Sequence, residues 1–384
     1  MKKKLLMSVF SPIENDGRVK RSIISLRKIY SIYLFSPTNN QNNKYKLDDE
    51  VVYISSIISW EKLPSKIALL IFYVELFIHT ILIRPNIIYG HDRYLCLATL
   101  IISRLFRLKT IYDAHELILP EKKFKLNFAN FLLYNSEKFS LSKFDILISA
   151  NKERAEVMKI HFNLKHLPLS IRNITQSTIG TVSKKYIKEK YINFVIKKEQ
   201  KYIVYSGYFA LERGLKFFVN LLNFLPRNIS LVLIGSGPAQ KFINYLKLSE
   251  PDLYKRINII NKIPNSHLQD VLSLFDIGLV YYSNININNI LCSPNKVYEY
   301  AHAGLPIIST GQETLIKLID GYKIGRTCKQ KEKEKSLYEF SENILEVLEN
   351  RNYYKFKLKE FTEKHEFHYE QKKLIDAVLQ KFET

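Results

Sequence analysis

The chain has 384 residues, 46% of them hydrophobic, and a formal net charge of +21. This length is too great for one ordinary core, and the composition excludes a disordered or low-complexity protein. Cys96, Cys292 and Cys328 lie far apart without metal-ligand spacing, so we expect reduced thiols in a cytoplasmic protein.

The basic residues are spread along the chain rather than gathered in one stripe. Roughly half of the excess falls in each half of the sequence, so we expect no nucleic acid as a partner. An anionic membrane surface is the favoured partner, because each basic residue near such a surface contributes roughly 1 kcal/mol. We therefore expect peripheral attachment to the inner face of the cell membrane, from which high salt should release the protein.

Two apolar segments could be mistaken for targeting or membrane segments. Residues 5–10 follow three lysines but stop before Pro12, so we expect a buried first strand and no signal peptide. Residues 67–83, IALLIFYVELFIHTILI, are at the short limit for a membrane span and include Glu75 and His79. We expect this segment to be a buried helix packed on a sheet.

Strand-like and helix-length segments alternate along the first half of the chain. Short apolar runs indicate strands at residues 5–10, 31–36, 51–56, 86–90, 109–114 and 144–150. Longer segments of helical length separate most of them, which is typical of a parallel sheet covered by helices on both faces. We assign residues 1–173 to this first domain.

The alternation resumes after residues 174–200, which are polar and rich in lysine and which we expect to be a linker and hinge. Further strands are expected at residues 202–207, 230–235, 257–260, 276–282 and 305–310. The segment from Lys331 onward contains no Pro or Gly, which favours helices. The sequence therefore predicts an α/β protein of two doubly wound, Rossmann-like domains, 1–173 and 201–384, facing each other across a cleft.

Glycines mark a candidate anion site in the second domain. The chain has only 12 glycines, and four of them fall in one short window at strand ends or helix starts: Gly207, Gly214, Gly235 and Gly237. Glycine lets backbone N–H groups approach a phosphate, and a following helix offers its positive end. Arg213 precedes Gly214 in YSGYFALERG, where its guanidinium could bind a diphosphate through two hydrogen bonds.

A second candidate segment is SPNKVYEYAHAGLPII, residues 293–308. Ser293 suits an N-cap and Pro294 the first position of a helix that ends at Gly304. The amino end of this helix would present backbone amides to an anion. Lys296 could meet a phosphate, and Glu299, in the second turn, could accept hydrogen bonds from two ribose hydroxyls.

In the first domain, ionisable side chains follow three of the predicted strands. They are Asp16, Arg18 and Arg21 after the first strand, His91 and Asp92 at the end of the fourth, and Asp113, His115 and Glu116 at the end of the fifth. Because the carboxyl ends of parallel strands meet at one edge of a sheet, we expect these side chains to converge on one rim.

These motifs resemble the family-four glycosyltransferases of the GT-B fold over essentially the whole chain. NDGRVKRSIISL is similar to the family's amino-terminal loop and first helix, YGHD and IYDAHEL to its acceptor-side strand ends, and LSIRN to the end of its first domain. IVYSGYFALERGLKFF, LVLIGSGP and SPNKVYEYAHAGLPII are similar to its donor half, and the last of these is the most specific.

The resemblance implies a retaining transfer of a sugar from a UDP- or GDP-sugar to a glycan or lipid-linked acceptor, in surface polysaccharide synthesis. It implies that residues 1–173 bind the acceptor, with His115 and Asp16 at the reacting centre and Arg18, His91, Asp92 and Glu116 on the acceptor side. It implies that residues 201–384 bind the donor, through Gly207, Arg213, Gly235, Ser293, Asn295, Lys296 and Glu299. Arg213 is expected at the diphosphate and Glu299 at the ribose. No metal or other cofactor is expected to be obligatory, because positive side chains and helix ends neutralise the leaving diphosphate.

Two positions depart from the family pattern. The family often has a second Glu eight positions before the ribose-binding one, where this chain has Leu291. Tyr208 replaces an Arg that often follows the strand-end glycine, and Arg213 stands where a Lys is expected. Subgroups with an SPNK-type loop share these features.

Two other functions are compatible with the sequence. A nucleotide-sugar epimerase has the same two-domain architecture but needs carboxylates placed for proton transfer, and Leu291 removes one candidate. A degenerate, non-catalytic sugar-nucleotide-binding subunit would have no need of His115, Arg213 and Glu299, all of which are present. The sequence does not identify the donor sugar, its base, the acceptor or the oligomeric state.

Overall fold

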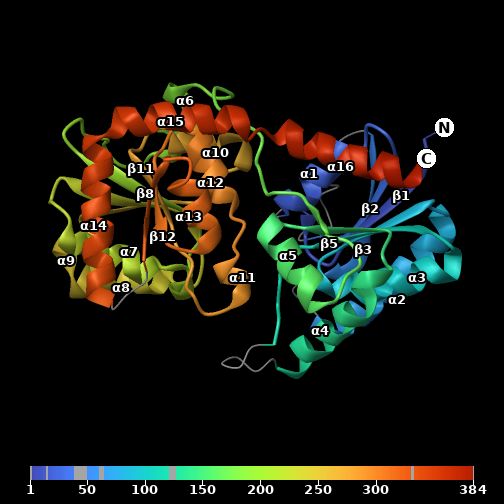
Figure 1. Cartoon of the computed structure of the whole chain (residues 1–384). Coiled ribbons are helices and arrows are strands. Elements are labelled where there is room, and N and C mark those ends of the chain that lie inside the picture. The colour runs from blue at the N-terminus through green and yellow to red at the C-terminus, as the bar shows by residue number, and fades with distance from the viewer. Residues whose placement is uncertain are drawn as a thin grey trace. The chain divides into compact units, whose positions relative to one another are not determined.

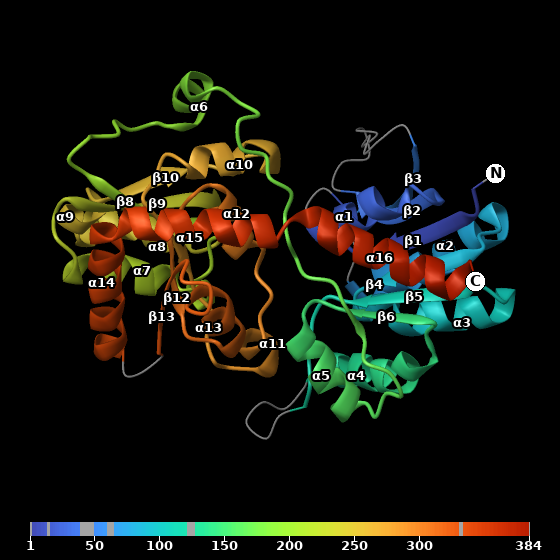
Figure 2. The same cartoon turned by 45° about the horizontal axis from the view of Figure 1, so that its top comes forward.

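The computed structural model describes residues 2–13, 16–38, 50–59, 65–120, 127–329 and 333–383. The chain forms two compact units (Figures 1 and 2). Unit 1 comprises Met1–Asn173 and His368–Thr384, and unit 2 comprises Ile174–Phe367. Each unit contains a parallel sheet with helices on both faces, which is the fold class that the sequence predicts.

The described part of unit 1 is built on a seven-stranded sheet of order β3-β2-β1-β4-β5-β6-β7. Its strands are β1 (Lys4–Val9), β2 (Ser31–Thr38), β3 (Val51–Ser59), β4 (Ile87–His91), β5 (Lys109–Ala114), β6 (Ile146–Ser149) and β7 (Leu169–Ser170). Its helices are α1 (Gly17–Leu26), α2 (Ser65–Ile83), α3 (Cys96–Phe106), α4 (Phe128–Ser140), α5 (Lys152–His161) and α16 (Phe367–Phe382), with short 3-10 turns η2 (Arg93–Leu95) and η3 (Leu141–Lys143).

Side chains that alternate along the strands of unit 1 form a core on each face of the sheet. On one face, Leu5 and Met7 of β1 pack with α1 and α16. On the other face, Leu6 packs with Phe72 of α2 and Ile102 of α3. The helices therefore cover both sides of β1, as expected when successive side chains of a strand point to opposite faces.

The described part of unit 2 is built on a six-stranded sheet of order β10-β9-β8-β11-β12-β13. Its strands are β8 (Lys201–Tyr208), β9 (Ile229–Ser236), β10 (Ile257–Ile260), β11 (Ile277–Val280), β12 (Ile307–Thr310) and β13 (Gly325–Cys328). Its helices are α6 (Lys184–Tyr191), α7 (Leu215–Leu221), α8 (Gln240–Ser249), α9 (Pro251–Tyr254), α10 (Asn265–Leu272), α11 (Ile287–Ile290), α12 (Asn295–His302), α13 (Glu313–Ile319), α14 (Lys333–Glu349) and α15 (Arg351–Lys364), with 3-10 turns η4 (Leu211–Arg213) and η5 (Leu222–Phe224).

Two cores also flank the sheet of unit 2. Phe218 of α7, Ile243 of α8 and Phe340 of α14 are buried on one face. On the other face, α10, α12, α13 and α15 bury Val271, Val297, Leu315 and Phe361. Both units thus have the helix-sheet-helix layering of doubly wound proteins.

The last helix requires a correction to the expected domain boundaries. It was expected in the second domain, but α16 belongs to unit 1, where Leu374, Val378 and Phe382 are part of the core. Glu370 of α16 accepts hydrogen bonds from the backbone N and the Nε of Arg172, each at 2.9 Å. Both views show α16 lying beside α1 (Figures 1 and 2).

Residues 174–200 also differ from the expected linker, because they pack along unit 2. Asp270 of α10 accepts hydrogen bonds from Gly180 N at 2.7 Å and from Val182 N at 3.1 Å. Ile187 of α6 is buried in the core that lines this face of the sheet. The segment contains a helix and contacts within unit 2, whereas its polar, lysine-rich sequence predicted a linker and hinge.

Helix α2 packs on the sheet as expected, but only one of its sides is buried, which corrects the expectation of a buried helix. Phe72 stacks on Phe35 of β2 with 4.3 Å between the ring centroids, and Glu75 accepts hydrogen bonds from Ser56 and Ile57 of β3. Within the described residues, α2 is the one helix that is long and apolar enough to cross a membrane by length and composition, and 33% of Lys66–Ile83 is buried.

Candidate functional site

The carboxyl ends of β1, β4 and β5 bring together most of the predicted acceptor-side residues in unit 1. Val9 is in register with His91, and His91 with Asp113, so the ends of these three strands are adjacent. Arg18 reaches the same place from α1, and His115 follows β5 directly. The contacts described below link five of these residues: Asp16, Arg18, His91, Asp113 and His115.

Arg18 and Asp113 form the buried anchor of this cluster. The Nε and Nη2 atoms of Arg18 donate to the two carboxylate oxygens of Asp113 at 2.9 and 2.7 Å. Arg18 Nη1 also donates to Ile171 O and to Asn173 Oδ1. Burial alone would raise the pKa of Asp113, but Arg18 and the hydrogen bond from His91 hold it well below its usual range. Asp113 is therefore a permanent anion that orients its neighbours.

The two histidines lie against this anion. His91 Nδ1 is 3.1 Å from His115 Nε2 and 3.6 Å from Asp113 Oδ2. His115 Nδ1 lies 3.9 Å from Asp16 Oδ2. Burial lowers the pKa of His115 below its ordinary value, although Asp113 and Asp16 oppose that change. His115 is thus a neutral imidazole at neutral pH, able to accept or donate one hydrogen bond.

Asp16 has a second role as the N-cap of α1. Its Oδ1 accepts hydrogen bonds from the backbone N–H groups of Arg18 and Val19, each at 3.0 Å. Burial would raise the pKa of Asp16, but His115 and these N–H groups lower it. The cap fixes the amino end of α1, and with it the position from which Arg18 reaches Asp113.

Asp92 and Glu116 lie at the same strand ends without direct contacts to the histidines. Asp92 has a φ of +66°, which is unusual for a residue with a side chain, and its Oδ1 accepts a hydrogen bond from Arg93 N at 2.7 Å. Burial raises the pKa of Asp92, and nearby Glu116 adds to the increase. Glu116 itself is exposed.

A metal ion fits this cluster poorly. The ligand atoms of His91, Asp113 and His115 are 3.1, 3.6 and 3.8 Å apart, which is close to the spacing of about 3.3 Å between two ligands on one zinc ion. However, Arg18 occupies both oxygens of Asp113, and a cation in this triangle would lie beside its guanidinium. The geometry therefore favours a hydrogen-bonded cluster.

In unit 2, the predicted glycines shape the ends of two neighbouring strands. Gly207 of β8 and Gly235 of β9 are in register, with φ of +142° and +140°. A Cβ on Gly235 would lie 2.0 Å from the carbonyl oxygen of Gly207, and a Cβ on Gly207 would lie 2.8 Å from Lys296 Nζ. Both positions need glycine, because the backbone conformation and the close approach exclude a side chain.

Two cations lie beside these glycines without an ion pair to any described residue. Lys296 Nζ lies 5.3 Å from the centroid of the Tyr205 ring, and Arg213, at the end of η4, is exposed. Burial lowers the pKa of Lys296 to about 8, with Glu299 opposing and Arg213 adding to the decrease. A cation that is partly desolvated and faces another cation is stabilised by a bound anion, beyond the stabilisation that Glu299 provides.

Helix α12 places its amino end at this point. The helix begins at Asn295 with Pro294 as its N-cap, one residue later than the sequence suggested, so Ser293 lies outside the helix. No side chain caps α12. Glu299 is half-buried in the second turn. The first-turn N–H groups of any helix point away from its carbonyls, so this end of α12 carries the positive end of the helix dipole.

Tyr300 holds α12 against the sheet. Its hydroxyl accepts a hydrogen bond from Ser206 N at 3.0 Å and donates to Leu279 O at 3.3 Å, which connects the helix to β8 and β11. Gly278 of β11 makes room for the ring, since a Cβ there would lie 2.4 Å from it. The family's first Glu position is occupied by Leu291, whose side chain is buried.

The most specific contact that sequence reasoning missed is the pairing of Arg18 with Asp113. Asp113 was recognised as polar and at a strand end, but its partner lies 95 positions earlier. Asn173, which accepts hydrogen bonds from Arg18 and Arg21, was read only as the end of a domain. Neither contact has a local sequence signal, because both depend on the order of the strands.

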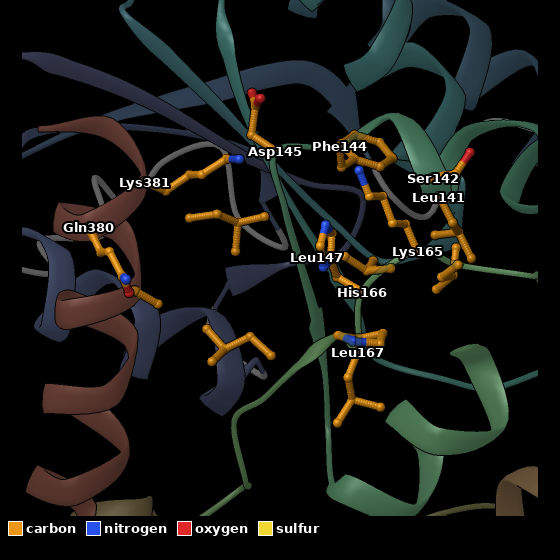
Figure 3. Close-up of a pocket in the computed structure, with 15 residues that line it drawn as sticks. Leu141, Ser142, Phe144, Asp145, Leu147, Lys165, His166, Leu167, Gln380 and Lys381 are labelled. Carbon is orange, nitrogen blue, oxygen red and sulfur yellow. The ribbon is translucent and has the colours of Figure 1, made fainter. Parts of the chain in front are cut away.

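A separate pocket of unit 1 lies away from these residues. Figure 3 shows it between the segment before β6, the loop before β7, and α16, with a volume of about 430 Å³. Lys165, His166 and Lys381 line it, and Asp145 precedes β6 at the amino end of that strand. None of the predicted site residues lines this pocket. The carboxyl-end cluster therefore carries the candidate chemistry of unit 1.

Comparisons with known proteins establish the fold. No family model and no curated protein matches the sequence. HepE from Anabaena, solved in complex with UDP, matches with a TM-score of 0.70 and 12% identity, covering 98% of this chain and 100% of that one. Sucrose-phosphate synthase from Thermosynechococcus elongatus matches with a TM-score of 0.77 and 14% identity, covering 99% of each chain. WaaG, a glycosyltransferase involved in lipopolysaccharide biosynthesis, matches with a TM-score of 0.70 and 12% identity, covering 98% of this chain and 99% of that one. The chain has the GT-B fold.

Proposed function

We propose that this protein is a retaining glycosyltransferase that moves a sugar from a nucleotide diphosphate to a glycan or lipid-linked acceptor in surface polysaccharide synthesis. The observation that carries the proposal is the pair of cations, Arg213 and Lys296, which have no ion pair within the described residues and lie beside two glycine strand ends and the amino end of α12. The GT-B fold supports it, as does the UDP-glucose bound by HepE. We propose a cytoplasmic location at the inner face of the membrane.

The proposed donor site uses each of these groups for one part of the nucleotide. Arg213 and Lys296 bind the diphosphate of a UDP- or GDP-sugar, and the amides at Ser293 and Asn295 add hydrogen bonds at the helix end. Gly207 and Gly235 allow the backbone to approach the phosphates. Glu299 accepts hydrogen bonds from the ribose hydroxyls.

The proposed reaction is driven by charge stabilisation on the leaving group. As the bond from the sugar to the diphosphate breaks, negative charge develops on the diphosphate, and Arg213 and Lys296 stabilise it. No metal is required for this step. We place His115 and Asp16 at the reacting centre, where the neutral imidazole can hold a hydroxyl, and Arg18, His91, Asp92 and Glu116 on the acceptor side.

One observation argues against the epimerase alternative. Such an enzyme needs carboxylates for proton transfer at the donor sugar, and the position where the family often has one is occupied by the buried Leu291. A degenerate binding subunit remains the second alternative. Incubation with UDP- and GDP-sugars separates the three: slow sugar release indicates a transferase, interconversion an epimerase, and binding without either a non-catalytic subunit.

Donor binding is tested by Glu299→Gln. Because hydrogen bonds to a charged group contribute about 1.5–3 kcal/mol, the variant should bind UDP or GDP roughly 10- to 100-fold more weakly in calorimetry. Glu313→Gln, an exposed change on α13, is the matched control and should bind as the parent does. Unchanged binding by Glu299→Gln would remove the ribose assignment.

Catalysis is tested separately by His115→Ala. A positioned hydrogen-bonding group typically contributes about 100-fold or more to the rate, so turnover should fall by roughly that factor while the donor dissociation constant stays the same. His166→Ala, an exposed histidine of the same unit, is the control. A folded His115→Ala protein with the parent's turnover would place His115 outside the reaction.

A further inference from the structure

The outer side of α2 is an apolar surface that the fold leaves uncovered. Seven apolar side chains recur at intervals of one to four residues along one side of the helix, and each is more than a third exposed: Ile67, Leu70, Val74, Phe77, Ile78, Ile81 and Leu82. The opposite side packs on the sheet through Phe72 and Leu76. A surface helix usually has polar residues opposite its core-facing stripe, whereas α2 is apolar on both sides.

Two further helices extend this surface. On α3, Leu97, Ile101 and Leu105 are spaced four residues apart and exposed. On α4, Phe128, Phe131, Leu132 and Phe139 are more than half exposed. The rings of Phe77 and Phe106 join α2 to α3 at 5.5 Å, and α3 packs against α4. We refer to these exposed side chains of α2, α3 and α4 as the apolar face; because they come from neighbouring helices, they are not the singly scattered apolar residues that are normal on protein surfaces.

Within the described residues, the exposed charged side chains on α2, α3 and α4 and directly after these helices are all cations, whereas Glu116 and Asp145, outside these helices, are exposed carboxylates. In residues 65–109 and 127–143, the exposed charged side chains are Lys66, Arg84, Arg104, Arg107, Lys109, Lys138 and Lys143. The three carboxylates in these ranges, Glu75, Asp92 and Glu137, are buried or half-buried. An apolar surface whose own helices carry only cations among their exposed charges matches an anionic lipid bilayer, which offers hydrocarbon below a layer of negative headgroups.

We propose that the apolar face is the membrane-binding surface of the protein, inserting its hydrocarbon side chains among the acyl chains of an anionic bilayer while the bordering cations meet the headgroups. A second copy of the chain fits less well, because a two-fold contact through this face would bring the same cations together. A transmembrane α2 is disfavoured too, since Glu75 is bonded to β3 and Phe72 stacks on β2.

This mode of attachment differs from the purely electrostatic one expected from the net charge. Screening by salt weakens the contribution of the cations, whereas the apolar contribution persists at high salt. Binding should therefore be partly, and not completely, released by salt. The inference is independent of the proposed reaction, because the experiment below contains neither donor nor acceptor.

The test is flotation of the full chain with vesicles of phosphatidylcholine, with and without phosphatidylglycerol, at low salt and at about 1 M salt, where the Debye length is about 3 Å. A variant with Leu70→Ser, Leu82→Ser and Leu105→Ser should partition at least about tenfold more weakly at both salt concentrations. These leucines are 65%, 71% and 64% exposed, so the variant is expected to fold. Arg104→Gln with Arg107→Gln should weaken binding to anionic vesicles only at low salt.

The matched control changes three exposed apolar residues outside the apolar face, Ile160→Ser, Val195→Ser and Leu248→Ser, which are 82%, 77% and 84% exposed. It should bind vesicles as the parent does. The proposal is overturned if the leucine variant binds like the parent, or if about 1 M salt releases the parent completely. It is also overturned if the parent ignores vesicles and instead forms dimers in light scattering that the leucine variant abolishes.

Discussion

In the proposed donor site, Lys296 is a cation whose surroundings would favour an anionic ligand. Its ammonium group lies near the Tyr205 ring and close to the end of β8, where Gly207 leaves it room. Burial lowers its pKa to about 8, and the neighbouring Arg213 contributes to the decrease. A bound diphosphate would favour the charged form and raise the pKa of Lys296 again.

This linkage predicts that donor affinity falls as the pH rises. Below about pH 8 the free protein already carries the charged lysine, so affinity should be constant. Above that pH, binding must take up a proton, and affinity for a UDP- or GDP-sugar should fall by up to about tenfold per pH unit. Calorimetry between about pH 7 and 9, in buffers of different ionisation enthalpy, measures both the affinity and the proton uptake.

Lys296→Gln is the control for this dependence. It should bind the donor more weakly than the parent at neutral pH and show no further loss at higher pH, because Arg213 stays charged throughout. If the parent's affinity for the donor did not change between about pH 7 and 9, the ammonium group of Lys296 would not be at the diphosphate.

At the scale of single residues, the sequence identified which side chains lie at the ends of strands, but it did not identify which side chains form hydrogen bonds or ion pairs with one another. Arg213, Lys296 and His115 could be singled out because charged residues next to strand-end motifs are locally visible. The anchor of the histidine cluster could not, because Arg18 meets Asp113 through the strand order β1-β4-β5. The order of strands in the sheet is set by the tertiary fold, and no local sequence pattern around Arg18 or Asp113 encodes it.

Among the secondary-structure elements, α12 is held against the sheet by close packing at a glycine. The Tyr300 ring fills the space above Gly278, and its hydroxyl is bonded to β8 and β11. The amino end of the helix, with Lys296 and Glu299, is therefore fixed relative to the ends of the strands. A small displacement of α12 should therefore lower both the free energy of unfolding and the affinity for the donor.

Gly278→Ala tests this coupling. The added Cβ would lie 2.4 Å from the Tyr300 ring, and overpacking of this kind costs about 1–3 kcal/mol in the free energy of unfolding. Donor affinity should fall as well, because α12 carries Lys296 and Glu299. Chemical denaturation and calorimetry on the same preparation provide both values.

The double variant Gly278→Ala with Tyr300→Leu is the control. Removing the ring relieves the clash, so its loss of stability should be smaller than the sum of the two single losses. Additive losses would mean that the two residues do not compete for the same space.

For the elements, the sequence predicted all strands that are apolar and of ordinary length. The missed strands are β7, with two residues, and β13, whose sequence GRTC has no apolar run. The exposed side of α2 was also missed, because an apolar helix of this length has the same composition whether one side or both are covered. Composition does not report which surface is covered.

In the whole molecule, the chain passes from unit 1 to unit 2 and back again. The first passage is at Asn173 and the second at Phe367, so consecutive helices α15 and α16 belong to different units. Leu358 of α15 is buried in the core of unit 2, and Leu374 of α16 is buried in the core of unit 1. Their allocation was not predictable, because both helices are charged, amphipathic and uninterrupted by Pro or Gly.

Matched substitutions in these two helices should destabilise different units. Leu374→Ala is expected to lower the free energy of unfolding of unit 1 by about 2–5 kcal/mol, which is the usual cost of truncating a buried leucine. Leu358→Ala is expected to lower the free energy of unfolding of unit 2 by a similar amount. Hydrogen exchange resolved by peptide should show faster exchange in the sheet of the affected unit. Equal acceleration in both sheets by either variant would contradict the division.

The return of α16 to unit 1 has a consequence for biosynthesis. Unit 2 is one continuous segment, whereas unit 1 lacks one of its covering helices until α16 is made. At about 5–20 residues per second, synthesis of the roughly 190 intervening residues takes on the order of 10–40 s. During that interval the apolar strip that Leu374, Val378 and Phe382 later cover is open on the nascent chain. Unit 1, whose sheet is translated before unit 2, is thus completed after it, and in this interval its uncovered apolar strip is the kind of surface that favours aggregation.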